Sequence, residues 1–147
     1  MDFDIFEGSV EDAYKVSQLI PEFDPPQYKQ QEYVKRTSRV PSLILIASYH
    51  GNPAGFKVGY QRDNDGSFYS WMGGVLPNYR RQKVAQQLAH QQEQWAKENG
   101  YQKITFKTRN RNIAMLMFAL KNDFKITKVT PKESIDDHRI WLEKILG

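Results

Sequence analysis

The chain contains no cysteine, and no apolar run in its 147 residues approaches the roughly 20 residues that span a bilayer. Without cysteine there is no disulfide framework, no thiolate zinc site and no covalent cysteine intermediate. The first twelve residues are acidic and lack the basic and apolar regions of a signal peptide. We therefore expect a cytoplasmic protein with no membrane partner.

Charge of one sign is only slightly in excess. The 21 Lys and Arg residues face 17 Asp and Glu residues, which gives a net charge of +4 and a pI near 9.2. Nucleic acid, an anionic membrane surface or a phosphate-rich ligand would all suit this balance. The content of 39% hydrophobic and 13% aromatic residues is sufficient for a folded core. We find no repeat or linker, and we predict one domain over residues 1–147.

Local patterns predict an α/β domain with a mixed, mostly antiparallel sheet of about seven strands flanked by helices. The expected strands are 3–7, 43–47, 54–61, 68–76, 104–106, 124–129 and 140–146. The expected helices lie between Ser9 and Pro21, from Asp24 through Val34, from Pro77 to about Asn99, and over 113–120. The last of these is apolar almost all round, so we expect it to be buried.

Three local signals sharpen these boundaries. Ser9 and Asp12 form a capping-box pattern. Asp24 precedes two prolines and Gln27, which is typical of a helix N-cap. The pair 73–74 is Gly-Gly inside a strand, which predicts a bulge or a close approach of a ligand to the backbone.

A basic loop between a strand and a helix is the most informative feature of the sequence. Residues 74–85 read GVLPNYRRQKVA. The free N–H groups and the dipole at a helix N-terminus favour a phosphate there, and Arg80, Arg81 and Lys83 would add charge-assisted hydrogen bonds. The alternative interpretation is a solvated basic first turn.

This loop resembles the acetyl-CoA pyrophosphate loop of the GCN5-related N-acetyltransferase (GNAT) superfamily, whose motif reads Arg/Gln-x-x-Gly-x-Gly/Ala. A second block supports the resemblance, because residues 112–124 (NIAMLMFALKNDF) look like the family's Asn…Ala…Tyr…Gly-Phe segment. The order of predicted elements also resembles the family's fold across nearly the whole chain.

The resemblance implies acetyl-CoA as the donor and an amine as the acceptor, joined in a ternary complex without a metal. The backbone of Val75 and Leu76 would pair with the pantetheine arm, and the backbone amides of 81–86 would hold the pyrophosphate. An N–H near Leu76 would stabilise the oxyanion. The residues assigned to acetyl-CoA are Val75, Leu76, Arg80, Arg81, Gln82, Lys83, Val84, Ala85, Gln86, Asn112, Ala114 and Phe118. Many relatives dimerise, so a homodimer is an open expectation.

The sequence departs from the family pattern at three positions. Lys83 replaces the loop glycine, and Asp123 replaces the glycine before Phe124. Phe118 stands where the family often has a tyrosine that protonates the departing CoA thiolate. Phenylalanine has no proton to give, so slow catalysis, another acid or a non-catalytic role stay open.

The acceptor side is defined less sharply. Histone-type members place a Glu base six residues before the position of Val75, and here that residue is Tyr69. Tyr69 is thus a candidate catalytic residue beside Leu76 and Asn112, although a wall of the acceptor site is the other interpretation of this tyrosine. Glu22 and Asp24 lie in the loop that borders the acceptor in this family. His50, His90 and His138 show no metal-ligand spacing.

Two alternative functions compete with acetyl transfer. A non-catalytic acyl-CoA-binding domain is suggested by Phe118. Nucleic-acid binding would use the basic residues Arg80, Arg81, Lys103, Lys107, Arg109 and Arg111. No DNA- or RNA-binding motif accompanies these charges, so we expect no nucleic-acid partner.

Overall fold

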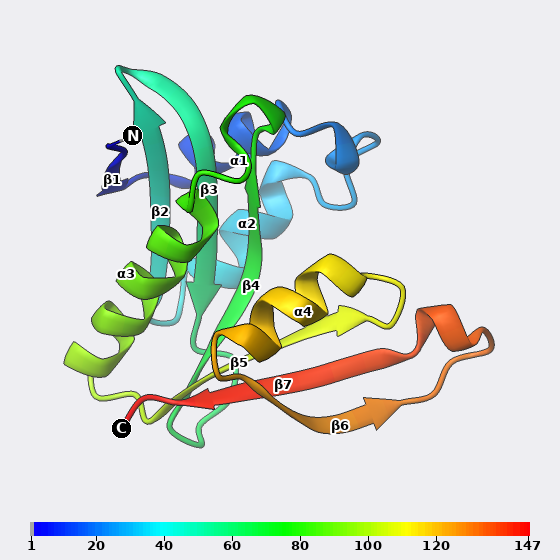
Figure 1. Cartoon of the computed structure of the whole chain (residues 1–147). Helices are drawn as coiled ribbons and strands as arrows, with labels where there is room; N and C mark the ends of the chain where they lie inside the picture. The colour runs from blue at the N-terminus through cyan, green and yellow to red at the C-terminus, as the bar shows by residue number, and fades with distance from the viewer. Residues whose placement is uncertain (1) are drawn as a thin grey trace.

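The computed structural model describes residues 2–147 and forms one seven-stranded sheet with two helices on each face (Figure 1). Its strands and α-helices, in chain order, are β1 Asp4–Glu7, α1 Val10–Ser17, α2 Gln30–Thr37, β2 Ser42–Tyr49, β3 Asn52–Tyr60, β4 Ser67–Val75, α3 Val84–Glu98, β5 Lys103–Arg109, α4 Ile113–Lys121, β6 Lys125–Thr130 and β7 Arg139–Ile145. Three short 3₁₀ turns, η1 Pro21–Phe23, η2 Pro77–Tyr79 and η3 Ile135–Asp137, complete the chain. The predicted fold class is confirmed.

The sheet has the strand order β1-β2-β3-β4-β5-β7-β6, and every neighbouring pair is antiparallel except β4 and β5. The parallel pair is short, because only 67–69 of β4 lie in register with 103–105 of β5. Beyond this point β4 continues upward in Figure 1 while β5 runs to the right. The two central strands therefore open into a split at their carboxyl ends.

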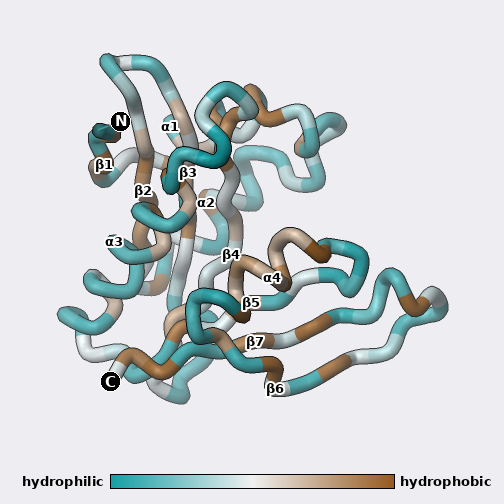
Figure 2. Tube along the Cα trace, viewed as in Figure 1, coloured by the Kyte–Doolittle hydropathy of each residue, from teal (hydrophilic) through white to brown (hydrophobic). Residues whose placement is uncertain are grey.

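Hydrophobic side chains fill both faces of β2 and β3, which explains the continuous apolar run predicted at 43–47. Figure 2 shows β2 as largely hydrophobic and the outer turns of α3 as hydrophilic. Leu43 and Leu45 pack with Leu88 of α3, whereas Ile46 and Phe56 pack with α1 on the opposite face. In residues 2–147 no helix is long and apolar enough to cross a membrane.

Helix α4 corrects the prediction of a buried helix. It packs on β5 and β7 through a third cluster, in which Leu116 and Ala119 contact Ile140 and Leu142. Its other sides face outward, and Met117 is 66% exposed. A helix that covers the outer part of a sheet buries one stripe only, so the apolar residues elsewhere on α4 stay accessible.

Asp24 is not a helix N-cap, which corrects a second prediction. It closes the 3₁₀ turn η1, where its N–H donates to the carbonyl of Pro21. Helix α2 begins later, after Lys29, and has no side-chain cap. The capping box of Ser9 and Asp12 at α1 is present as predicted.

The β4 strand does contain a bulge, but the bulge lies at Trp71 rather than at the predicted glycine pair. The register with β3 shifts between Met72 and Ser70, which leaves Trp71 as the extra residue. At Gly74 the close neighbours are the side chains of Phe23 in η1 and of Ile20, the residue just before η1. A Cβ at this position would lie 2.7 Å from Ile20 Cδ1 and 3.4 Å from the ring of Phe23. Gly74 thus lets the segment after α1 rest directly on β4.

Candidate functional site

The open edge of β4 is the first component of the site. The Leu76 N–H donates to the Ala54 carbonyl of β3 at 2.8 Å. Because neighbouring residues of a strand direct their N–H groups to opposite sides, the Val75 N–H faces the split. The Val75 carbonyl is also directed to this side, where it accepts from Arg80 Nε at 3.0 Å. The amide predicted at Leu76 is therefore already satisfied, and the free amide is that of Val75.

The loop that follows has an unusual backbone. Arg81 has a φ of 63° and Lys83 has a φ of 67°, so both adopt the left-handed conformation that normally favours glycine. Lys83, which stands at the glycine position of the motif, thus adopts a conformation that glycine adopts without strain. The helix predicted from Pro77 therefore starts later than expected. Helix α3 begins at Val84, directly after the second left-handed residue.

Free backbone N–H groups converge in this loop. The first intrahelical bond of α3 runs from the Gln87 N–H to the Lys83 carbonyl. The N–H groups of 84–86 therefore lack helical partners, as at every helix start. Alternating left-handed residues just before a helix turn successive N–H groups into an anion-binding concavity. The arrangement suits a phosphate in geometry as well as in charge.

The side chains of the loop divide into three groups. Arg81, Lys83 and Ala85 are exposed, and Gln86 is half-buried. Val84 is 1% exposed and belongs to the core, so only its amide faces the loop. The Gln82 Oε1 atom is buried and has no hydrogen-bond partner within residues 2–147.

Arg80 is directed away from the concavity. Its Nη2 atom lies 2.8 Å from the Glu22 carboxylate and its Nε donates to Val75. The hydrogen bond from Arg80 lowers the pKa of Glu22 below its ordinary value. Arg80 therefore braces the loop against η1, and in this conformation Arg81 and Lys83 are the loop cations left to meet an anion.

The second predicted block lies across the split, over β5 (Figure 1). Asn112 is exposed at the start of α4 and donates from Nδ2 to Thr108 Oγ1 at 2.9 Å. Ala114 is exposed and Phe118 is half-buried. The two blocks therefore flank the split from the two strands that form it.

Tyr69 lies at the point where β4 and β5 separate. Its ring is 4% exposed and meets the Tyr60 ring edge-on, with 5.6 Å between centroids. Burial raises the pKa of Tyr69 to about 12. The hydroxyl therefore keeps its proton at neutral pH, which disfavours Tyr69 as the base and favours it as a wall.

Sequence reasoning missed Lys57, in the middle of β3. A Cβ at Gly73 would lie 3.5 Å from Lys57 Cγ, so the lysine leans over the glycine of the neighbouring strand. Burial lowers the pKa of Lys57 to about 8, while the Glu93 carboxylate opposes that shift. Glu93 itself pairs with Lys144 at 2.8 Å. In the sequence Lys57 is a lone lysine between Gly55 and Gly59, on the side of the strand opposite its large apolar residues.

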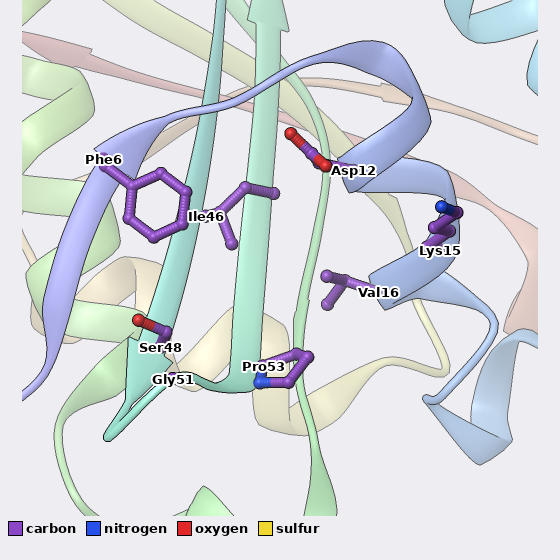
Figure 3. A pocket seen from close by; sticks show the side chains of 8 residues that line it. All are labelled: Phe6, Asp12, Lys15, Val16, Ile46, Ser48, Gly51 and Pro53. Carbon is purple, nitrogen blue, oxygen red and sulfur yellow. The ribbon is translucent and has the colours of Figure 1, made fainter.

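A shallow pocket near the other end of the sheet contains none of the predicted site residues (Figure 3). It lies between β1, α1 and the turn from β2 to β3, where Phe6, Val16 and Ile46 form its apolar side. Asp12 lines it too, but this carboxylate accepts from the Ser9 N–H in the capping box. We therefore place the site at the split.

Comparison with known proteins identifies the fold and the family. Many solved structures share the fold, including the three that follow. The ribosomal-protein-S18-alanine N-acetyltransferase from Escherichia coli superposes with a TM-score of 0.82 at 14% identity, over 99% of this chain and 95% of that one. Ard1 from Thermoplasma volcanium gives 0.80 at 19% identity, over 99% and 98%. The PaiA N-acetyltransferase from Thermoplasma acidophilum, in complex with coenzyme A, gives 0.75 at 18% identity, over 99% of each chain.

No curated protein sequence matches the chain. Residues 9–124, however, match the model of the acetyltransferase (GNAT) family. This range begins at the cap of α1 and ends after α4, so it includes the split, the basic loop and both predicted binding blocks. By this match the chain belongs to the acetyltransferase (GNAT) family.

Proposed function

We propose that this protein transfers an acetyl group from acetyl-CoA to an amine by direct attack in a ternary complex. Family membership supports CoA-dependent acetyl transfer as the general activity. The observation that carries the proposal for this chain is the loop between β4 and α3. There, two left-handed cationic residues precede the unpaired N–H groups of 84–86, directly beyond the open edge of β4.

Each part of the donor has a matching part of the protein. The amides of 81–86 and the charges of Arg81 and Lys83 would hold the pyrophosphate. The open edge of β4 at Val75 would pair with the pantetheine arm as an added strand does. Asn112, Ala114 and Phe118 would line the opposite side of its path.

The chemical step needs one oxyanion donor, and we assign it to the Val75 N–H instead of the Leu76 N–H. The neutral amine attacks the thioester carbonyl, so a C–N bond forms and the C–S bond breaks. Val75 is directed to stabilise the oxygen that becomes negative. The sulfur leaves as thiolate and is protonated by water, while the amine nitrogen loses its extra proton to water.

The alternative functions are distinguished by different observations. A non-catalytic acyl-CoA-binding role uses the same loop, and only an activity assay separates it from acetyl transfer. The structure gives little support to nucleic-acid binding, because three of the six proposed basic residues are engaged in ion pairs. These are Arg80 with Glu22, Lys103 with Glu143, and Arg111 with Asp137. Cytoplasmic location and dimer formation stay predictions.

The test has a binding arm and an activity arm. At about 100 times its Kd, acetyl-CoA should add about 2.7 kcal/mol to the free energy of unfolding. Lys83→Glu should weaken binding of acetyl-CoA at least about tenfold, whereas Lys97→Glu at the far end of α3 should not. Both variants should bind a pantetheine fragment without pyrophosphate like the parent protein. Absence of a thermal shift at millimolar acetyl-CoA would exclude the proposal.

The activity arm measures thiol release over a panel of amines, amino acids and peptide N-termini. Release that depends on the amine supports acetyl transfer. Binding of acetyl-CoA without any release would favour the non-catalytic role.

A further inference from the structure

The sheet face opposite α3 and α4 is covered by α2 only as far as β3 and β4, and beyond this it presents a group of aromatic and basic side chains. Strand alternation places them there. Ile104 and Phe106 of β5 pack toward α3 and α4, so Lys107 faces the other way. Ile140 and Leu142 of β7 pack under α4, so Trp141 also faces the other way.

This basic-aromatic face is defined by six residues from five segments of the chain, and they meet beside the split. They are Arg36, Arg62, Tyr69, Trp71, Lys107 and Trp141. Tyr69 stands where β4 and β5 separate, so the face borders the point where an amine would reach the thioester.

Stacking on the aromatic rings fixes where the positive charges lie. Arg62 lies 5.1 Å from the ring centroid of Tyr69 and 5.1 Å from that of Trp141, so it spans from β4 to β7. Lys107 Nζ lies 5.1 Å from the same Trp141 ring. Arg36 lies 4.5 Å from the Trp71 ring. These cation–π contacts hold Arg36, Arg62 and Lys107 against the rings of the face, and Lys128 Nζ also lies 5.9 Å from the centroid of Trp141.

Two of the three cations that define this face are not balanced by carboxylates. Within residues 2–147 neither Arg62 nor Lys107 has a carboxylate within ion-pair distance. Arg36 is paired with Glu32 at 2.9 Å, and Asp137 is paired with Arg111 at 2.7 Å.

The pKa of Lys107 reports the same imbalance. Burial lowers the pKa of Lys107, and its cationic neighbours lower it further: Arg62, Arg36, Arg139 and Lys132. An anion bound among these cations would relieve their mutual repulsion.

We propose that the acceptor is a small amine that also carries an acidic group, a carboxylate or a phosphate, which is seated between Arg62 and Lys107 while the amine points to the split at Tyr69. This inference rests on the proposed acetyl transfer and names its acceptor class. The rings of Tyr69, Trp71 and Trp141 form the apolar floor. The same cations disfavour a protonated amine beside them, which supplies the neutral nucleophile without a dedicated base.

The experiment compares acceptors in matched pairs that differ only in the acidic group. An amino acid is compared with its amide, and phosphoethanolamine with ethanolamine, by thiol release from acetyl-CoA. We expect the acidic member of at least one pair to have a kcat/KM at least about tenfold higher. The pair with the larger ratio tells whether carboxylate or phosphate is preferred.

Charge-neutralising variants locate the preference. Arg62→Gln and Lys107→Gln should each reduce the acid-to-amide ratio about tenfold or more, as expected for loss of a charge-assisted hydrogen bond. The ratio isolates the acidic group, because an effect of these variants on the protonation of the amine acts on the acid and on its amide alike. Lys97→Gln makes the same change in net charge on α3 and should leave the ratio unchanged.

Binding provides a readout that does not depend on turnover. With CoA bound, titration calorimetry should detect the N-acetyl amino acid more tightly than its amide, and Lys107→Gln should remove the difference. The inference is overturned if kcat/KM is equal within every pair of acceptors, or if both variants leave the acid-to-amide ratio intact. In either case binding of acetyl-CoA would still support the proposed function. The inference would also be overturned if a short DNA duplex bound more tightly than the N-acetyl amino acid and both variants abolished that binding.

Discussion

Arg80 connects three parts of the site through one guanidinium group, and its closest contact is with Glu22. Nη2 lies 2.8 Å from the carboxylate on η1, and Nε donates to the carbonyl of Val75 at the end of β4. The basic loop is therefore fixed both to the strand before it and to the turn after α1. Both side chains are substantially exposed, so the pair orients the loop more than it stabilises the fold.

A double-mutant cycle of Glu22→Gln and Arg80→Gln should give a coupling energy of about 0.2–1 kcal/mol in the free energy of unfolding at pH 7. The pKa of Glu22 is lowered from its ordinary value of 4.5 by Arg80. The coupling should therefore be fully present above that value and disappear as the pH falls through the lowered pKa. Urea titrations at pH 7 and at successively lower pH values below 4.5 check this, and a coupling that does not weaken as the pH falls would contradict the ion pair.

Lys83→Gly should stabilise the ligand-free protein. Lys83 holds a φ of 67°, and a left-handed conformation costs a residue with a side chain about 1–2 kcal/mol. Glycine adopts it without that cost, so we expect a gain of about 1 kcal/mol by chemical denaturation. Lys97→Gly in the last turn of the same helix should instead lose about 1 kcal/mol. Equal losses in both variants would show that the loop is not strained at Lys83.

The lowered pKa of Lys57 predicts that the free energy of unfolding depends on pH. Burial lowers its pKa to about 8 from 10.5, so between these values the unfolded chain binds more protons than the folded protein. Stability from this group therefore rises as the pH increases from about 8 to 10.5. Lys57→Met should be more stable than the parent protein at pH 7, and the advantage should shrink above pH 8.

The measurement for Lys57 is the difference in free energy of unfolding between variant and parent at several pH values from 7 to 10.5. The exposed Lys97→Met serves as control, because its difference should not change with pH in this way. A constant difference for Lys57→Met would mean that the lysine is charged in the folded protein throughout this range.

Much of the fold could be predicted from the sequence because its signals are local. The alternation along β3 and the buried run of β2 reflect side chains that leave a strand on fixed faces. The capping box of Ser9 and Asp12 is complete within four residues. At Asp24 the local signal was equally good, but the chain passes through bends until Lys29. The turn η1 rests on β4 at Gly74, a contact between distant residues that no local signal contains.

The site was predictable only in part, for the same reason. The basic loop is contiguous in the sequence, and its resemblance to a known motif located it. The basic-aromatic face is assembled from Arg62, Tyr69, Lys107 and Trp141, which are separated by up to 79 positions. No short window contains the stacking of Arg62 between two strands. Likewise the free amide at Val75 rather than Leu76 depends on which residue pairs with β3.

Tyr69→Phe should leave the shape of the pH–rate profile unchanged. Burial of the ring raises the pKa of the Tyr69 hydroxyl to about 12, so this hydroxyl does not titrate between pH 6 and 10. Loss of a general base would lower the rate by about 10²–10⁴-fold. We expect instead no more than a few-fold change in kcat/KM, measured with the acceptor that gives the fastest thiol release. Tyr60→Phe is the matched control, because its hydroxyl accepts from Arg36 at 3.1 Å and its loss should affect stability more than rate. A fall of 10² or more for Tyr69→Phe, with folding and acetyl-CoA affinity intact, would restore the tyrosine as the group that removes the proton.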